Sequence, residues 1–291
     1  MDSPEEIELW KQLVPREGMK HEFLIDGLLA LASLHLAHLE PSSNQFYTSL
    51  GVEYQSHGLL GFNALLPSVD GENVNALLVF SVIITVMAFA ISVTSPKDPE
   101  STPSEALQSI VRLLRGVAVI NDISQGSIRS SMLGILVRPG KGPPSNHDFL
   151  RREDLEAAMA SLIERSEQLS KYVGPLQHQL YVSCIRSLQE AFEHVLTYGN
   201  VSIAIAWPET VSNKLMEQFQ QEDPMAQLIW VHYGVLTLVI HNFWWGKGFG
   251  VRLINSVSES LHSTDNEWMT YTQWARDCAR VVSERAESGS G

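Results

Sequence analysis

Apolar and polar positions along the chain recur with the period of α-helices rather than with the alternation of β-strands. Residues 21–39 (HEFLIDGLLALASLHLAHL) carry a broad apolar stripe at helical spacing, which Pro41 ends. The pattern predicts an all-α fold, a single large helical bundle with an internal apolar pocket. Further helices are predicted within 44–66, 74–93, 106–123, 152–171, 175–198, 208–220, 251–262 and 266–284, and over the apolar run that opens at Asp223-Pro224 and continues to 245.

The strongest break in this pattern lies at about residues 137–147. Three prolines and two glycines over 137–146 exclude a helix or a central strand there. We interpret the segment as a loop that separates two helical halves of one domain spanning 1–291. It serves either as a linker or as a lid over a pocket, and the pattern does not decide between the two.

Residues 74–93 contain no charged side chain and are long enough to cross a bilayer as a helix. Polar residues interrupt the run, however, and no cluster of Lys and Arg flanks it to set an orientation. A helix that is apolar on all sides is also typical of the centre of a large bundle. We therefore expect a soluble protein without membrane insertion.

Composition narrows the classes of partner. The chain has 291 residues, of which 44% are hydrophobic and 18% charged, and its net charge is −13. This acidic balance disfavours direct binding to nucleic acid, which needs Lys and Arg against the phosphates. The two cysteines and an N-terminus without a signal-peptide pattern lead us to expect an intracellular, cytoplasmic protein. Self-association as a homodimer is left open.

A search for chemical motifs finds no phosphate-binding loop, no dinucleotide fingerprint and no nucleophile elbow. His35 and His38 are three residues apart, but no carboxylate completes a metal site around them. We expect no metal and no cofactor.

The most informative segment is an aromatic block near the C-terminus. Trp230, Tyr233 and Gly234 follow i, i+3, i+4 spacing, so they share one helix face, and the small Gly234 is expected to leave space beside the rings. Core packing and a pocket wall both explain this face. On the second interpretation, the candidate catalytic residues are Tyr233, His232 and His241, and the candidate substrate-binding residues are Trp230, Gly234, Phe243, Trp244, Trp245, Lys247 and Phe249.

Three stretches form a recognisable pattern: Leu9-Trp10 and Val14-Pro15 with FLIDGLLALASLHLA (23–37), residues 73–90 with LLRG (113–116), and Ala206-Trp207-Pro208 with DPMAQLIWVHYGVL (223–236) and FWWGKGFGVRLI (243–254). In this order they resemble the C-terminal regulatory domain of fungal zinc-cluster transcription factors of the sterol uptake control type. The resemblance covers nearly the whole chain, and it implies an all-α domain whose apolar pocket accommodates a sterol. The zinc-cluster head of those regulators needs six cysteines, whereas this chain has two.

Two functions are compatible with these observations. The first is binding of a small, largely apolar terpenoid, polyketide or sterol-like molecule, followed by a cofactor-free cyclisation or hetero-Diels–Alder cycloaddition in fungal secondary metabolism. Shape and a hydrogen-bond donor suffice for such chemistry, and a chain that begins at Met1 without the zinc-cluster head favours this interpretation. The second is non-enzymatic sensing of a sterol-type ligand within a regulator, which would act in the nucleus.

Overall fold

The structure is a computed structural model, and it describes residues 8–94, 105, 107–112, 147, 149–199, 201–264 and 267–288. All elements in these ranges are helical, which confirms the all-α prediction. The chain divides into two compact units, an N-terminal unit (residues 1–101 and 109–138) and a C-terminal unit (residues 102–108 and 139–291). The single domain and its internal pocket stay predictions. The predicted loop at 137–147 lies, apart from His147, outside the described residues.

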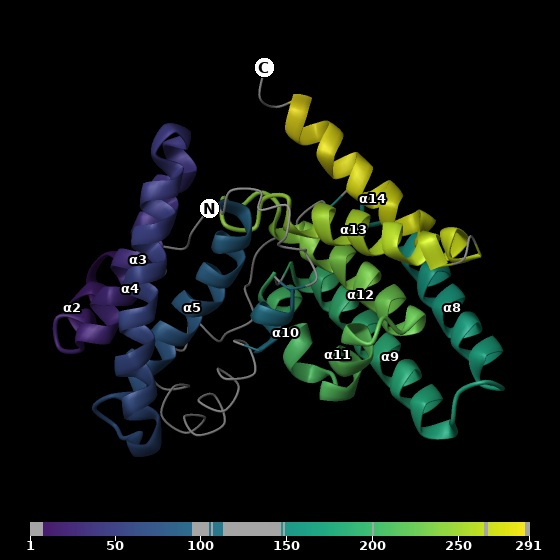
Figure 1. The fold of residues 1–291 in the computed structure, drawn as a ribbon, viewed down its shortest axis with the longest axis horizontal. Helices are drawn as coiled ribbons and strands as arrows, with labels where there is room; N and C mark the ends of the chain where they lie inside the picture. The colour runs from purple at the N-terminus through teal and green to yellow at the C-terminus, as the bar shows by residue number, and fades with distance from the viewer. Residues whose placement is uncertain are drawn as a thin grey trace. The chain divides into compact units, whose positions relative to one another are not determined.

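The N-terminal unit is built on three long helices (Figure 1). The helices α3 (Glu22–Leu39), α4 (Asn44–Leu65) and α5 (Val74–Thr94) contact one another and follow η1 (Leu9–Leu13) and the short α2 (Val14–Gly18). The ring of Phe80 enters between Gly27 and Gly58, where added Cβ atoms would lie 2.7 and 2.8 Å from it. These two glycines therefore allow α5 to pack closely against α3 and α4.

The uncharged helix α5 is largely buried within its unit, with 67% of its most apolar 18-residue window inside the protein. Among the described residues, α3 and α5 are long and apolar enough to span a membrane by length and composition. The bent pair Asn213–Gln220 and Pro224–Ile240 would add a third span if it were counted as one. The expected absence of membrane insertion stays a prediction.

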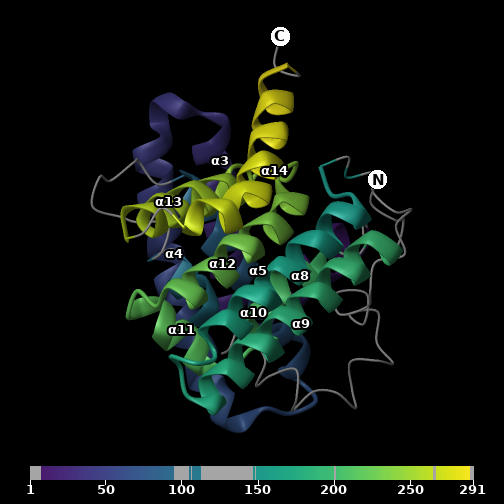
Figure 2. The ribbon, with the colours of Figure 1, turned by 90° about the vertical axis from the view of Figure 1, so that its right-hand side faces the viewer.

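The C-terminal unit is organised around one central helix. This helix, α12 (Pro224–Thr237), is buried along its whole length from Met225, and η4 (Leu238–Ile240) continues it. Figures 1 and 2 show the other described helices of the unit around it. These are α8 (Arg152–Leu169), α9 (Pro175–Tyr198), α10 (Ser202–Thr210), α11 (Asn213–Gln220), α13 (Phe249–Thr264) and α14 (Trp268–Ser288). All of them contact α12 except α8, which packs on α9 and α14.

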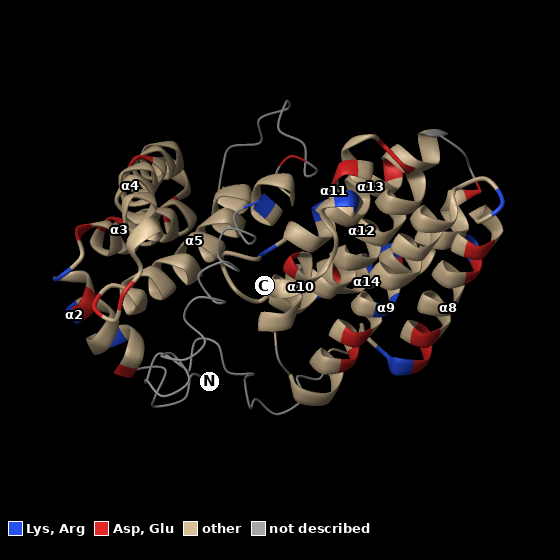
Figure 3. Cartoon of the chain, turned by 90° about the horizontal axis from the view of Figure 1, so that it is seen from below, with Lys and Arg blue, Asp and Glu red and all other residues tan. Residues whose placement is uncertain are grey.

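Charge follows this arrangement. Figure 3 marks acidic and basic residues along helices such as α8, whereas α5 and α12 contain none. The central α12 begins at Asp223, whose carboxylate accepts a hydrogen bond from the backbone N–H of Ala226 at 2.8 Å, as the Asp-Pro start signal predicts.

Two helix boundaries differ from the sequence prediction. Pro208 does not begin a helix: it lies inside α10, and the next helix, α11, begins after Ser212, whose hydroxyl accepts from the N–H of Lys214. The helix predicted to continue to 245 ends at Thr237. The apolar run continues beyond that point because the following residues are also packed inside the unit. Of the helix predicted at 106–123, the structure describes residues 107–112 as helical, and the rest lies outside the described residues.

Candidate functional site

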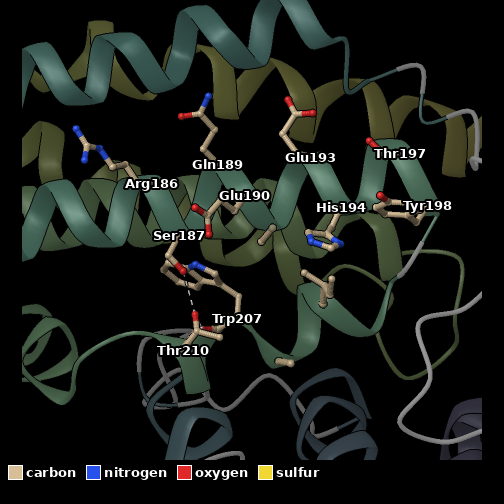
Figure 4. A pocket seen from close by; sticks show the side chains of 13 residues that line it. Arg186, Ser187, Gln189, Glu190, Glu193, His194, Thr197, Tyr198, Trp207 and Thr210 are labelled. Atoms are coloured by element: carbon tan, nitrogen blue, oxygen red, sulfur yellow. Dashed lines mark hydrogen bonds between the residues drawn. The ribbon is translucent and has the colours of Figure 1, made fainter.

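A groove of about 860 Å³ opens between α9 and α10 in the C-terminal unit (Figure 4). One wall is the polar face of α9, from which Glu190 and His194 point toward α10. The buried indole of Trp207 lies on the α10 side. The remaining lining residues are Arg186, Ser187, Gln189, Ala191, Glu193, Thr197, Tyr198, Ile203, Ala206 and Thr210.

Two hydroxyl groups join the walls of the groove beside Trp207. The hydroxyl of Thr210 donates to the carbonyl oxygen of Trp207 at 2.8 Å, and the hydroxyls of Ser187 and Thr210 lie 3.0 Å apart. Because Thr210 uses its proton on the carbonyl, Ser187 is the donor between the two hydroxyls. This short chain of hydrogen bonds holds α10 against α9 at the end of the groove.

The ring of Trp207 connects the groove to the centre of the unit. It stacks on Tyr233 of α12, with centroids 5.0 Å apart and planes 25° apart, and meets the ring of Trp230 edge-on at 5.3 Å. Trp230 and Tyr233 meet edge-on at 5.2 Å, as their i, i+3 spacing predicts. We call these three side chains the aromatic triad; they are at most 1% exposed.

The polar tips of the aromatic triad find no partner in the part of the chain that the structure describes. The Nε1 atoms of Trp207 and Trp230 and the hydroxyl of Tyr233 are buried and have no hydrogen-bond partner among the described residues. Burial raises the pKa of Tyr233 far above its ordinary value, so its hydroxyl stays protonated. The triad therefore offers three buried donors, and the two indoles cannot act as acceptors.

The three candidate catalytic residues do not converge on one point. His232 turns to α14, where its ring stacks on Trp274 at 5.5 Å, and its Nδ1 donates to the carbonyl of Leu228 at 2.9 Å. Burial lowers the pKa of His232 to about 4, so the ring is neutral. Thus Tyr233 lies behind the groove, whereas His232 faces another helix.

His241 lies beyond the helix, in the turn that follows η4. Its Nδ1 accepts a hydrogen bond from the N–H of Gly248 at 3.3 Å, and its Nε2 is buried without a partner among the described residues. Burial first, and then the nearby charge of Lys247, lower the pKa of His241. These contacts give His241 the role of closing the turn.

The space expected beside Gly234 is filled. A Cβ atom at Gly234 would lie 2.6 Å from Cγ1 of Ile254, and one at Gly250 would lie 2.7 Å from the carbonyl oxygen of Gly234. These two glycines therefore bring α12 and α13 into close contact, and they leave no room for a ligand at that point.

The other candidate binding residues lie in and after the turn at 241–248 instead of on α12. The rings of Phe243 and Trp245 stack at 5.2 Å, and Phe243 is 43% exposed. Lys247 is exposed, Trp244 is partly buried, and Phe249 is buried at the start of α13. None of these five residues lines the groove between α9 and α10.

Groups of three or more His, Cys, Asp or Glu side chains that could hold a metal ion are not found in the described part of the chain. His38 instead lines a hollow of about 340 Å³ in the N-terminal unit. Cys184 and Cys278 are buried and free, and burial raises their pKa to about 11 and about 12. Neither thiol has the low pKa of a nucleophile.

Sequence reasoning missed the wall of the groove on α9. Its residues recur at Arg186, Glu190 and His194, one helical turn apart, which is also the pattern of an ordinary solvated face. Of the groove's lining, Ala206 and Trp207 carried a signal, because they belong to the Ala206-Trp207-Pro208 stretch of the family resemblance. In comparisons with known proteins, no family model, no curated protein and no solved structure matches this chain.

Proposed function

We propose that the C-terminal unit binds a small, ring-bearing natural product in the α9–α10 groove and that the chain is a ligand-sensing domain, as its resemblance to sterol uptake regulators implies. The observation that carries the proposal is the double position of Trp207, which lines the groove and stacks on Tyr233 of the central helix. A ligand that contacts this indole acts directly on a contact between α10 and α12.

The dimensions of the groove support binding. Its volume of about 860 Å³ falls within the roughly 300–1,000 Å³ of small-molecule sites. Trp207, Ile203 and Ala206 supply apolar surface for a ring system. Glu190 and His194 supply polar groups that fix its orientation. The expected ligand is therefore an apolar ring system that carries polar substituents, and not a pure hydrocarbon.

Sensing is favoured over turnover because two of the three candidate catalytic residues, His232 and His241, are held elsewhere. His232 is neutral and held by Leu228 and Trp274, and His241 is held in a turn. For a sensor the ligand needs only to favour one arrangement of helices over another, by its differential affinity for the two.

The test is recovery of the ligand. The protein is purified from a fungal host and denatured, and the released small molecules are identified and counted by mass spectrometry. We expect a stoichiometric ring-bearing compound from the wild type and none from Ala206→Trp, which fills the groove. Ala157→Trp on the exposed face of α8 is the matched control and should retain the compound. Equal recovery from all three proteins contradicts the proposal.

One observation favours a second candidate function, cofactor-free ring closure. The hydroxyl of Tyr233 is buried, protonated and unpartnered among the described residues, which suits a donor that polarises a substrate carbonyl in an apolar environment. A cycloaddition redistributes π electrons into two new bonds and gains or loses no atom, so no oxidant is needed. Incubating the recovered compound or its open-chain isomer with fresh protein distinguishes the candidates. A sensor returns the compound unchanged, and an enzyme converts the open-chain isomer in the wild type but not in Tyr233→Phe.

A further inference from the structure

The aromatic triad carries three buried donors, and one of its members, Trp207, also lines the groove. Native proteins leave few buried polar groups without partners, and each such group calls for an explanation. Here three occur in side chains whose ring centroids are all within 5.3 Å of one another. The neighbouring ring of Phe219, 6.1 Å from Trp230, offers no acceptor. All three donors therefore lack an acceptor atom among the described residues.

The helix that carries Trp207 lacks one backbone hydrogen bond and is joined at its end to α9 through side-chain hydroxyls. The helix α10 has only nine residues, and Pro208 inside it has no N–H to donate to the carbonyl of Ala204. At its end, α10 is held to α9 through the hydroxyls of Ser187 and Thr210. Moving Trp207 with α10 therefore breaks few backbone hydrogen bonds. Once the ring of Trp207 has moved, the groove is continuous with the space beside the buried donors.

We propose that Trp207 is a gate and that the ligand is a neutral ring-bearing molecule with two or more acceptor oxygens, of the ketone, ester or ether type, which accept hydrogen bonds from the aromatic triad. This inference rests on the proposed function, because it takes the groove as the entry to the site. It specifies the chemistry of the ligand, which the groove alone leaves open.

The surroundings select this chemical class. All three polar tips of the triad are donors and only the Tyr233 hydroxyl can also accept, so an ammonium group would find one neutral acceptor and no carboxylate within the triad. A carboxylate would lose its hydration against a helix without any charged residue. Neutral oxygen acceptors satisfy the donors at the lowest desolvation cost.

The experiment compares two probes with the same ring skeleton, a steroid diketone (androstenedione) and the parent hydrocarbon (androstane), by equilibrium dialysis against the full chain. We expect the diketone to bind and the hydrocarbon to bind at least about tenfold more weakly. Tyr233→Phe keeps its ring and removes the hydroxyl donor, whereas Trp207→Phe and Trp230→Phe each remove an indole N–H and leave a smaller aromatic ring. Each should weaken diketone binding roughly fivefold and change hydrocarbon binding less. Circular dichroism confirms that each variant is folded.

Trp268→Phe is the matched control, because Trp268 lies beneath Arg165, outside the triad, and its loss should not change binding. Equal binding of both probes, no binding of the diketone, or diketone binding that is insensitive to the three variants overturns the inference. The proposed function fails separately, when no compound is released from the wild type or when Ala206→Trp retains it.

The gating role of Trp207 is tested separately, through the rate at which the diketone associates. Pro208→Ala restores an N–H donor within α10 and should slow association of the diketone several-fold, measured by stopped-flow tryptophan fluorescence. An association rate equal to that of the wild type contradicts a gate at Trp207.

Discussion

Replacing Tyr233 with Phe should stabilise the unliganded protein. The substitution removes one oxygen atom and keeps the ring contacts with Trp207 and Trp230. A buried polar group without a partner costs about 1–3 kcal/mol. Against this, the loss of one buried atom weakens packing slightly. We expect the free energy of unfolding to rise by about 1 kcal/mol, and the melting temperature to rise by about 2–4 °C for a unit of this size.

Tyr181→Phe is the matched control because it makes the same chemical change at a hydroxyl that has partners. Tyr181 is fully buried, and its hydroxyl donates to the carboxylate of Asp223 at 2.9 Å. That carboxylate also caps α12. Removing the hydroxyl should lower the free energy of unfolding by about 1–3 kcal/mol, because the hydrogen bond is made to a charged group. The two variants are therefore expected to shift stability in opposite directions.

The assay is thermal and urea unfolding followed by tryptophan fluorescence. Six of the seven tryptophans lie in the C-terminal unit, so the signal reports mainly on that unit. If Tyr233→Phe destabilises the protein as much as Tyr181→Phe does, the Tyr233 hydroxyl has a strong partner in the free protein. The reasoning from unsatisfied donors is then refuted.

Three further predictions concern packing, pH and thiol chemistry. Gly234→Ala should destabilise the protein by about 1–3 kcal/mol, because its Cβ would lie 2.6 Å from Ile254, and Ile254→Ala should partly rescue it. Burial lowers the pKa of His232 to about 4 from 6.5, so the unfolded chain binds a proton that the folded protein does not. The free energy of unfolding should fall by about 3 kcal/mol as the pH drops from about 6.5 to about 4, and His232→Phe should remove this slope. The buried thiols of Cys184 and Cys278 should react with a thiol reagent at pH 8 only after denaturation, in a colorimetric assay.

Each of these predictions has a control and an outcome that contradicts it. Gly71→Ala should have little effect, because nothing lies within 4 Å of its Cβ position, and equal stability of Gly234→Ala to the wild type would refute the close contact. His57→Phe at an exposed position should keep the acid slope; a slope that persists in His232→Phe assigns it to other groups. Rapid labelling of either thiol in the native protein would show that the site opens readily.

Helix positions were predictable where local signals mark them. The helix from Pro175 to Tyr198 was predicted with its observed bounds, because a proline begins it and Gly199, with a φ of 64°, ends it. The error at Pro208 has a physical cause as well. A proline is more frequent in the first turn of a helix than inside it, so sequence reasoning placed the helix start there. The end of α12 was missed because the residues that follow Thr237 are as apolar as the helix itself.

The candidate site was less predictable, because three consecutive residues of the central helix face three different neighbours. His232 stacks on Trp274 of α14, Tyr233 on Trp207 of α10, and Gly234 lies against Ile254 of α13. Spacing along one helix shows which residues share a face, but it does not show which distant segment covers that face.

The pairing of Trp207 with Tyr233 decides how the aromatic block is interpreted. Without this contact the block is an ordinary core, with polar tips that any neighbour could satisfy. With it, the unsatisfied donors of α12 lie one ring away from a groove of ligand size, and the separating ring belongs to a short helix that contains a proline. Neither the donors nor the groove indicates a ligand site alone, since unsatisfied groups occur in cores and polar grooves occur on surfaces. Their shared residue, Trp207, is therefore the position at which mutation separates a binding function from a structural one.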